Sequence, residues 1–235
     1  MNNIAIIPAR GGSKRIPRKN IKPFLGVPII KYAIDAALAS GCFNEVMVST
    51  DDIEIAELAL SFGAKVPFYR SVLTANDHAT TADVLLEVLE CYQQLGREFD
   101  NLCCIYPTAP FITAQMLNQA MFQLQQSNAL SLIPVTAFPY PILRSLQIIN
   151  NCVSFNWPQY AQTRSQDLTP AYHDCGMFYA MQVQHFIKTN TILNERTLPI
   201  ILPESQVQDI DTEEDWKMAE FKYAYLHNLL KLNND

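Results

Sequence analysis

The segment at residues 3–20, NIAIIPARGGSKRIPRKN, joins a short apolar run to a loop rich in positive charge. Residues 4–7 are apolar and stop at Pro8, which is typical of a buried strand. The loop after them holds two glycines, one serine and five of the 17 lysines and arginines. Because the 235-residue chain has a formal net charge of −6, this loop is its densest concentration of positive charge.

The composition is that of a globular protein. Hydrophobic residues make up 49% of the chain and charged residues 17%, which favours a well-buried core and argues against disorder. We expect residues 1–235 to form a single domain with an excursion at about residues 137–175. No apolar stretch approaches the roughly 18 residues of a membrane helix, and Arg10 interrupts the first apolar run before it could act as a signal-peptide core. These features predict a cytoplasmic protein without a membrane partner.

The charge balance and the cysteines exclude other classes. An acidic chain disfavours a nucleic-acid partner, because nucleic-acid binders usually carry a basic face. The six cysteines contain no CxxC pair, so we expect reduced thiols in or near the core rather than zinc ligands. Cys103 and Cys104 are adjacent in a predicted strand, and their side chains should therefore point to opposite faces of a sheet.

Strand and helix patterns alternate along the first half of the chain. Strand patterns occupy residues 4–7, 46–48 and 102–106, and helical spacing occupies residues 27–39, 53–62, 81–95 and 113–125. This alternation predicts an α/β domain with a mostly parallel sheet.

The pattern changes in residues 134–179, which show no helical spacing and contain five prolines. Two extended stretches, 146–149 and 153–157, flank Asn150-Asn151, a pair suited to a hairpin turn. We therefore expect an antiparallel excursion from the main sheet. Helical spacing returns after Glu213 and continues towards Leu230.

The basic loop has the chemistry of a polyphosphate site. Gly11 and Gly12 let a ligand approach backbone N–H groups closely, because glycine has no Cβ. Ser13 can donate a hydrogen bond, while Arg10 and Lys14 offset negative charge at the carboxyl end of the strand, where ligands of open α/β sheets bind. The alternative is a solvated basic loop. The loop matches neither GxxxxGK[ST] nor GxGxxG, so generic NTPase and dehydrogenase interpretations lose their main support.

A second candidate site is the acidic pair Asp209-Ile210-Asp211. In an extended backbone the two carboxylates share one face while Ile210 points into the core. Thr212 and Asp215 have capping-box spacing, so the following helix should begin at Thr212. Two carboxylates that face a triphosphate would bind Mg²⁺; ordinary turn carboxylates are the alternative.

Five blocks in order resemble the CMP-sialic acid synthetase family of cytidylyltransferases. They are IPARGGSKRIPRKN (7–20), STDDIEIAELALSFGAKVPFYR (49–70), YPTAPF (106–111), TRSQDL (163–168) and QDIDTEEDW (208–216). The resemblance implies a Rossmann-like nucleotidyltransferase fold (GT-A-like), with an antiparallel excursion that forms a homodimer. It implies that CMP passes from CTP to the anomeric hydroxyl of a nine-carbon 2-keto sugar acid, a nonulosonic acid, and that pyrophosphate leaves. Catalytic Mg²⁺ would bind at Asp211, with Asp209 as a direct or water-mediated ligand.

The resemblance also implies roles for single residues. Nucleotide binding would involve Ala9, Arg10, Gly11, Gly12, Ser13, Lys14, Asn20, Arg70, Thr80 and Thr81. Catalysis would involve Arg10, Lys14, Lys19 and Asp211. Sugar binding would involve Tyr106, Arg164, Gln166, Asp167 and His173.

In the family the excursion reaches into the neighbouring active site, where Arg164 would pair with the sugar carboxylate. A loop held by local hydrogen bonds and a purely structural His173 are the alternatives. Ser165 departs from the family, since sialic-acid enzymes commonly have a second arginine there.

Tyr106 bears on the choice of sugar. It stands where the family usually has glutamine, and a tyrosine suits a sugar with fewer hydroxyls and more methyl surface. The blocks look most like those of family members that act on pseudaminic acid, with N-acetylneuraminate and legionaminate as alternatives. Tyr106 could equally pack in the pocket wall without discriminating. A non-catalytic CTP-binding protein is the alternative from another class, and the product of an enzyme would feed surface glycans or glycosylated flagellin.

Overall fold

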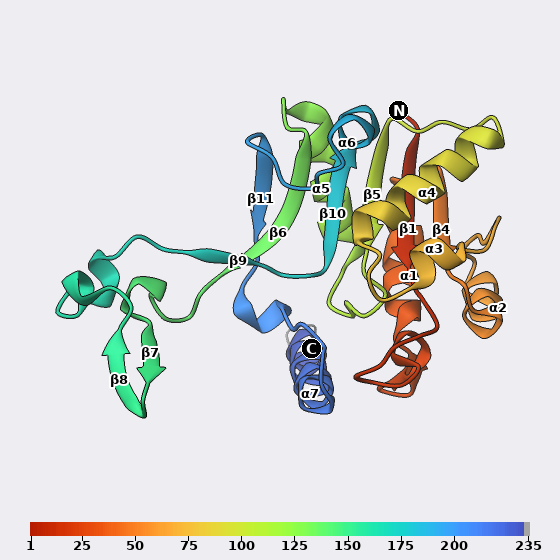
Figure 1. Ribbon diagram of the computed structural model, residues 1–235. Helices are drawn as coiled ribbons and strands as arrows, with labels where there is room; N and C mark the ends of the chain where they lie inside the picture. The colour runs from red at the N-terminus through yellow and green to blue at the C-terminus, as the bar shows by residue number, and fades with distance from the viewer. Residues whose placement is uncertain (233–235) are drawn as a thin grey trace.

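A seven-stranded sheet forms the centre of the structure, a computed structural model that describes residues 1–232 (Figure 1). The strand order is β11-β6-β10-β5-β1-β4, and β9 pairs with β6. The strands are β1 (Asn3–Pro8), β4 (Glu45–Ser49), β5 (Asn101–Ile105), β6 (Ser131–Ala137), β9 (Tyr172–Asp174), β10 (Phe178–Gln182) and β11 (Thr197–Ile201). Only β9 and β10 run against the others among these strands, which confirms the predicted mostly parallel α/β sheet.

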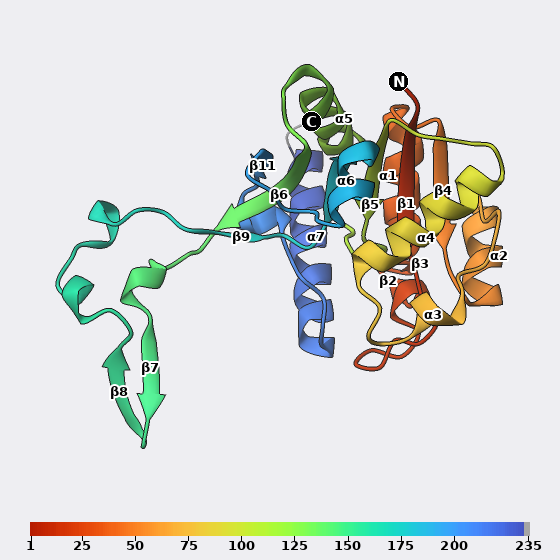
Figure 2. The same ribbon diagram turned by 45° about the horizontal axis from the view of Figure 1, so that its top comes forward.

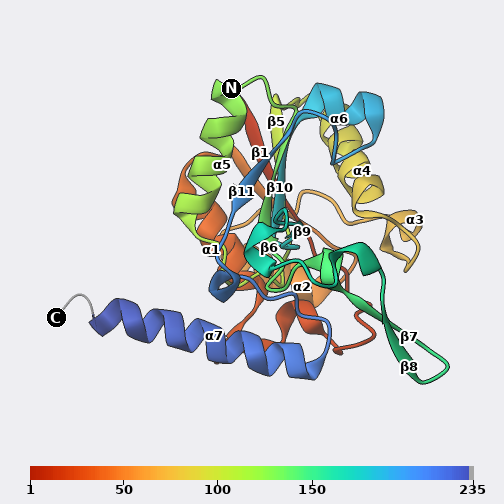
Figure 3. The ribbon, with the colours of Figure 1, turned by 90° about the vertical axis from the view of Figure 1, so that its left-hand side faces the viewer.

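Helices cover both faces of this sheet (Figure 3). The described helices are α1 (Ile30–Ser40), α2 (Ile53–Ser61), α3 (Val72–Ala75), α4 (Thr81–Gln94), α5 (Ala114–Gln126), α6 (Val183–Thr189) and α7 (Glu213–Leu232). Residues of α1, α2, α5 and α7 share one core cluster with Cys103, and residues of α4 and α6 share the other with Cys104. The predicted opposite orientation of the two cysteines is confirmed. None of the described helices has the length and apolar character needed to span a membrane.

The helix expected over residues 27–39 begins later than predicted, at Ile30. The residues before it form a two-stranded ribbon in which β2 (Pro23–Phe24) pairs antiparallel with β3 (Val27–Pro28). Leu25 and Gly26 connect the strands with φ values of 48° and 86°. Two successive positive φ values are typical of a tight hairpin turn. The first residues of the predicted helix are therefore paired in this hairpin and are not helical.

A capping box fixes the N-terminus of each of two helices, α4 and α7. Thr80 caps α4, with its side chain accepting from the Asp83 N–H while the Asp83 carboxylate accepts from the Thr80 N–H. Thr212 and Asp215 make the same reciprocal pair at the start of α7, 3.2 Å and 2.8 Å long. The predicted capping box is confirmed, and it ends the extended segment that carries the acidic pair directly before the helix.

An arm, residues 138–171, projects away from the sheet (Figures 1 and 2). Within it β7 (Leu146–Ile149) pairs antiparallel with β8 (Cys152–Phe155), and Asn150 and Asn151 have positive φ, which confirms the predicted hairpin. The arm, which the structure describes throughout, contains 3₁₀ turns at Ile142–Arg144, Pro158–Tyr160 and Ser165–Asp167 and no α-helix.

The cysteines of the described chain are all free thiols, as predicted. Cys103, Cys104 and Cys175 are buried, whereas Cys152 is exposed on the arm. The prediction that all six lie in or near the core is therefore wrong for Cys152, because no other part of the described residues 1–232 buries the hairpin that carries it.

Candidate active site

Two adjoining cavities open beyond the carboxyl ends of β1 and β5. The cationic cavity, about 520 Å³, is lined by the loop after β1, the segment 74–84 and the end of β5. The acidic cavity, about 390 Å³, is lined by Lys19, Tyr106, Thr108, Asp174, Gly176, Tyr179, Asp209 and Asp211. Lys19, Tyr106 and Thr108 belong to both walls, so the basic loop and the acidic pair converge on one continuous region.

The glycine loop is held tightly to the start of α2. The Gly11 N–H donates to Asp51 Oδ1 at 2.9 Å, and the Ser13 N–H donates to the Gly11 carbonyl at 3.1 Å. A Cβ added to Gly11 would lie 2.7 Å from Asp52 Oδ2, so a side chain there would require Asp52 to shift. These two amides, which were expected to face a ligand, are instead bonded within the protein, because the side chain of Asp51 and the loop itself reach them.

The basic residues of the loop are paired with carboxylates. Arg10 Nη1 lies 2.7 Å from Asp77 Oδ1, and Lys14 also pairs with Asp77. The Lys14 and Arg10 contacts hold the pKa of Asp77 below its usual value. Arg15 lies 2.8 Å from Asp211 Oδ1. The cations predicted to bind phosphate therefore line the cationic cavity, and each is paired with an acidic side chain.

Lys19 links the two cavities. Its Nζ donates to the Ile210 carbonyl at 2.6 Å and lies 3.6 Å from Asp211 Oδ1. Asn20 is buried and donates to the Arg10 carbonyl at 2.9 Å, which fixes the loop from behind. These long-range contacts place the ammonium group of Lys19 at the junction of the two cavities.

Three further residues predicted to bind the nucleotide, Arg70, Thr80 and Thr81, line the cationic cavity. Arg70 is buried, and its guanidinium donates to Ser49 Oγ at 3.2 Å and to the Ser49 carbonyl at 2.8 Å. Loss of hydration lowers the pKa of Arg70. Thr80 and Thr81 line the same cavity. Ala9 does not, because its side chain is buried in the core.

Asp209 and Asp211 line the acidic cavity together, while the side chain of Ile210 is buried, as the extended geometry predicted. Loss of hydration raises the pKa of Asp209, and the charge of Asp211 raises it further. In the described part of the chain no group of three or more His, Cys, Asp or Glu side chains is arranged to hold a metal. A pair of carboxylates nevertheless fits Mg²⁺, which often takes one or two protein carboxylates and completes its shell with phosphate and water.

The structure adds Asp174 and Tyr179 to the predicted residues. Tyr179 donates to Asp174 Oδ2 at 2.6 Å, and its ring meets that of Tyr106 edge to face, with centroids 5.6 Å apart. His173 was predicted from the sequence as a sugar-binding residue, whereas its neighbour Asp174 was not. The one signal in the sequence was strand alternation. Adjacent residues of a strand point to opposite faces, so if His173 points away from the cavity, Asp174 points towards it.

Four of the five residues predicted to bind the sugar, all except Tyr106, line neither cavity. Arg164 forms a two-bond pair with Asp167, at 2.8 Å and 3.2 Å. Gln166 lies in the same short turn of the arm. His173 packs against Phe138, with ring centroids 4.9 Å apart, and is absent from both cavity walls.

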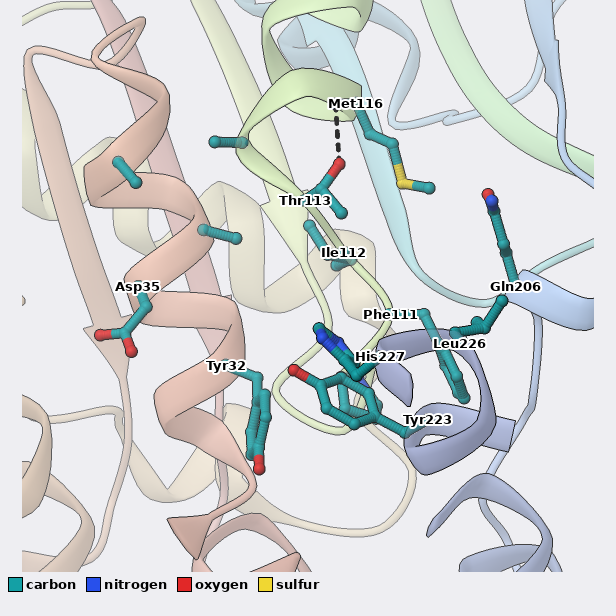
Figure 4. A pocket seen from close by; sticks show the side chains of 14 residues that line it. Tyr32, Asp35, Phe111, Ile112, Thr113, Met116, Gln206, Tyr223, Leu226 and His227 are labelled. Carbon is teal, nitrogen blue, oxygen red and sulfur yellow. Dashed lines mark hydrogen bonds between the residues drawn. The ribbon is translucent and has the colours of Figure 1, made fainter. Parts of the chain in front are cut away.

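A further cavity of about 580 Å³ lies between α1, α7 and the segment before α5 (Figure 4). Tyr32, Phe111 and Tyr223 contribute aromatic rings to its wall, and the ring of His227 packs against that of Tyr223 with centroids 4.0 Å apart. None of its lining residues was predicted as a site residue. Because it lacks the convergent cations and carboxylates of the other two cavities, it is not the candidate active site.

Comparisons with known proteins agree with this geometry. The cytidylyltransferase family matches residues 4–215. The pseudaminic acid cytidylyltransferase of Campylobacter jejuni (serotype O:2) is 42% identical over 97% of this chain and 98% of its own length. The CMP-N,N′-diacetyllegionaminic acid synthase of Legionella pneumophila is 32% identical over 100% of this chain and 99% of its own length.

The fold has solved counterparts. The structure of a CMP:2-keto-3-deoxy-manno-octonic acid synthetase complexed with CTP superposes with a TM-score of 0.69 at 18% identity, over 96% of this chain and 99% of that one. This similarity confirms the predicted nucleotidyltransferase fold. With the match to the family over most of its length, the chain belongs to the cytidylyltransferase family.

Proposed function

We propose that this protein transfers CMP from CTP to the anomeric hydroxyl of pseudaminic acid. The observation that carries the proposal is the convergence of the basic loop and the acidic pair on two adjoining cavities that share Lys19. The full-length similarity to a pseudaminic acid cytidylyltransferase selects this sugar acid among the nonulosonic acids. Because the chain is also similar, although less so, to a legionaminic acid synthase, legionaminic acid is a second candidate substrate.

The cationic cavity is the site for CTP. Arg10 and Lys14 would exchange Asp77 for the phosphates, and the buried guanidinium of Arg70 lies on the wall where the base would bind. The sugar hydroxyl attacks the α-phosphorus and loses its proton, the bond to the β-phosphate breaks, and pyrophosphate leaves. Reactions of this type depend mainly on positioning and charge neutralisation, which a fixed loop of cations provides.

Asp209 and Asp211 would hold Mg²⁺ at the junction with the sugar site. The ion would neutralise charge on the α-phosphate and lower the pKa of the attacking hydroxyl. Arg15 and Lys19 balance the charge of Asp211. The carboxylate of Asp211 therefore already binds positively charged groups. Its position on the cavity wall suits a divalent cation.

A homodimer would complete the sugar site. Arg164, Gln166 and Asp167 lie on the arm, away from the acidic cavity of their own chain. The arm also exposes apolar side chains, among them Tyr140 (81% exposed) and Ile148 (75%). Exposed apolar surface of this kind marks interaction sites, which supports an arm that packs on a second copy and carries Arg164 to its acidic cavity.

Purified protein supplied with CTP, Mg²⁺ and one sugar acid at a time tests the proposal. Pyrophosphate release and CMP-sugar formation are compared for pseudaminic acid, legionaminic acid and N-acetylneuraminate, and we expect the highest kcat/KM with pseudaminic acid. A clear preference for N-acetylneuraminate would overturn the choice of sugar. Binding of CTP without pyrophosphate release on any acid would favour a nucleotide-binding protein without catalysis.

A further inference from the structure

The acidic cavity holds a carboxylate that phosphate binding and metal binding leave unused. Asp174 stands at the end of β9, where Oδ1 accepts from the Gly176 N–H at 2.8 Å and Oδ2 accepts from the Tyr179 hydroxyl at 2.6 Å. An ionised carboxylate has about four acceptor positions, so these two contacts fix the group and leave acceptor capacity. Asp174 is thus a positioned hydrogen-bond acceptor on the cavity wall.

An aromatic surface lies beside this acceptor. Tyr106 and Tyr179 form an edge-to-face pair, and their hydroxyls are engaged by Thr81, at 2.9 Å, and by Asp174. Loss of hydration raises the pKa of both tyrosines, so both remain protonated at neutral pH. With their hydroxyls occupied, the two rings offer the cavity mainly apolar carbon surface.

The charges around this corner restrict what can bind. Asp174, Asp209 and Asp211 share the cavity with a single cation, Lys19, among its lining residues. A second carboxylate of the substrate would be repelled at Asp174, whereas a neutral hydrogen-bond donor would be accepted. A hydroxyl would satisfy the carboxylate but leave the rings without an apolar partner. An acetamido group satisfies both, because its N–H nitrogen is bonded directly to a carbonyl carbon that carries a methyl group.

We propose that Asp174 is a specificity-determining residue that accepts a hydrogen bond from an acetamido N–H of the sugar acid, while the acetamido methyl packs on Tyr106 and Tyr179. This inference rests on the proposed function, since it assigns a role within the sugar site. It places a selection for acetamido-bearing acids in the main body of the chain, apart from the arm residues.

The test compares wild type with Asp174→Asn on pseudaminic acid and on two analogues, each with one acetamido group replaced by an O-acetyl ester of the same shape. Wild type should favour the parent acid over one analogue by about 10- to 100-fold in kcat/KM, the effect of a hydrogen bond to a charged group. Asp174→Asn should raise the KM for the sugar acid, leave the KM for CTP unchanged and lose most of this preference. Asp35→Asn, an exposed carboxylate on α1, is the matched control and should match wild type.

A second variant covers the case in which Asp174→Asn does not fold. Tyr179→Phe keeps the ring and removes the hydroxyl that orients Asp174, so it should reduce the same preference to a smaller extent. If the variant that folds keeps the wild-type preference and sugar KM, the inference is overturned while the transferase activity stands. If wild type turns over no sugar acid, the proposed function itself has failed.

Discussion

The loop after β1 and the arm both carry residues predicted to bind substrate, yet they are held in opposite ways. The loop is anchored in the body by buried Ile16, by Asn20 behind the Arg10 carbonyl and by Arg18, which pairs with Asp52. The arm instead satisfies its polar groups locally, as in the Arg164–Asp167 pair, and leaves its apolar side chains exposed. Under our proposal, the nucleotide half of the site would therefore be complete in one chain, whereas the sugar half would need a second.

The strongest test of this difference uses two variants that should lose turnover, one changed in the body of the chain and one changed on the arm. We expect Asp211→Asn to lower kcat by about 10³-fold or more, because it removes a proposed Mg²⁺ ligand from a partly exposed position without disturbing the core. Arg164→Ala should lower kcat/KM for the sugar acid by about 10- to 100-fold, the effect of losing a charge-assisted bond. Both should unfold at the wild-type temperature.

Coexpression of the two variants then tests whether each active site is built from one chain or from two. If the arm serves the partner, a mixed dimer has one intact site, with Asp211 from one chain and Arg164 from the other. Random pairing of equal amounts restores about a quarter of the wild-type rate. A mixture no more active than the sum of its parents would show that the arm does not complete a neighbouring site.

The anchoring of the loop can be tested by two adjacent glycines. An alanine Cβ at Gly11 would meet Asp52 at 2.7 Å, whereas one at Gly12 would meet nothing within 4 Å. We expect Gly11→Ala to lower the free energy of unfolding by about 1–3 kcal/mol, the usual cost of an overpacked contact, and Gly12→Ala to change it little. Urea denaturation of the two variants measures the difference. Equal stability would mean that Asp52 yields easily, and that the loop is less firmly held than its contacts suggest.

Sequence periodicity predicted the helices and strands whose defining contacts lie close together in the sequence. The spacing of apolar residues located most helices, and alternation placed Cys103 and Cys104 on opposite faces. The ribbon before α1 was missed because it depends on positive φ at Leu25, which no periodicity reports. The strands β10 and β11 were missed for a related reason, since they are defined by pairing with β5 and β6, which lie far away in the sequence.

The candidate site was predictable where residue type alone carries the chemistry. The cations of the loop and the carboxylates of Asp209 and Asp211 are such residues, and the fold brings them together. Asp77 and Asp174 were not predicted, because a single acidic residue in a polar segment gives no signal of its own. Their importance comes from contacts such as that of Asp77 with Arg10, 67 residues away, which only the folded chain reveals.

Asp77 provides the smallest and most specific test of the nucleotide half. It pairs with Arg10 and Lys14 on an exposed wall of the cationic cavity, so under our proposal it would compete with phosphate for the same cations. We expect Asp77→Asn to lower the KM for CTP by about two- to five-fold at low ionic strength, since exposed pairs contribute little. Because salt screens exposed charges, the difference should shrink as ionic strength rises, whereas Asp35→Asn should show no effect at any salt concentration. A rise in the KM for CTP would mean that Asp77 positions the two cations for phosphate rather than occupying them in its place.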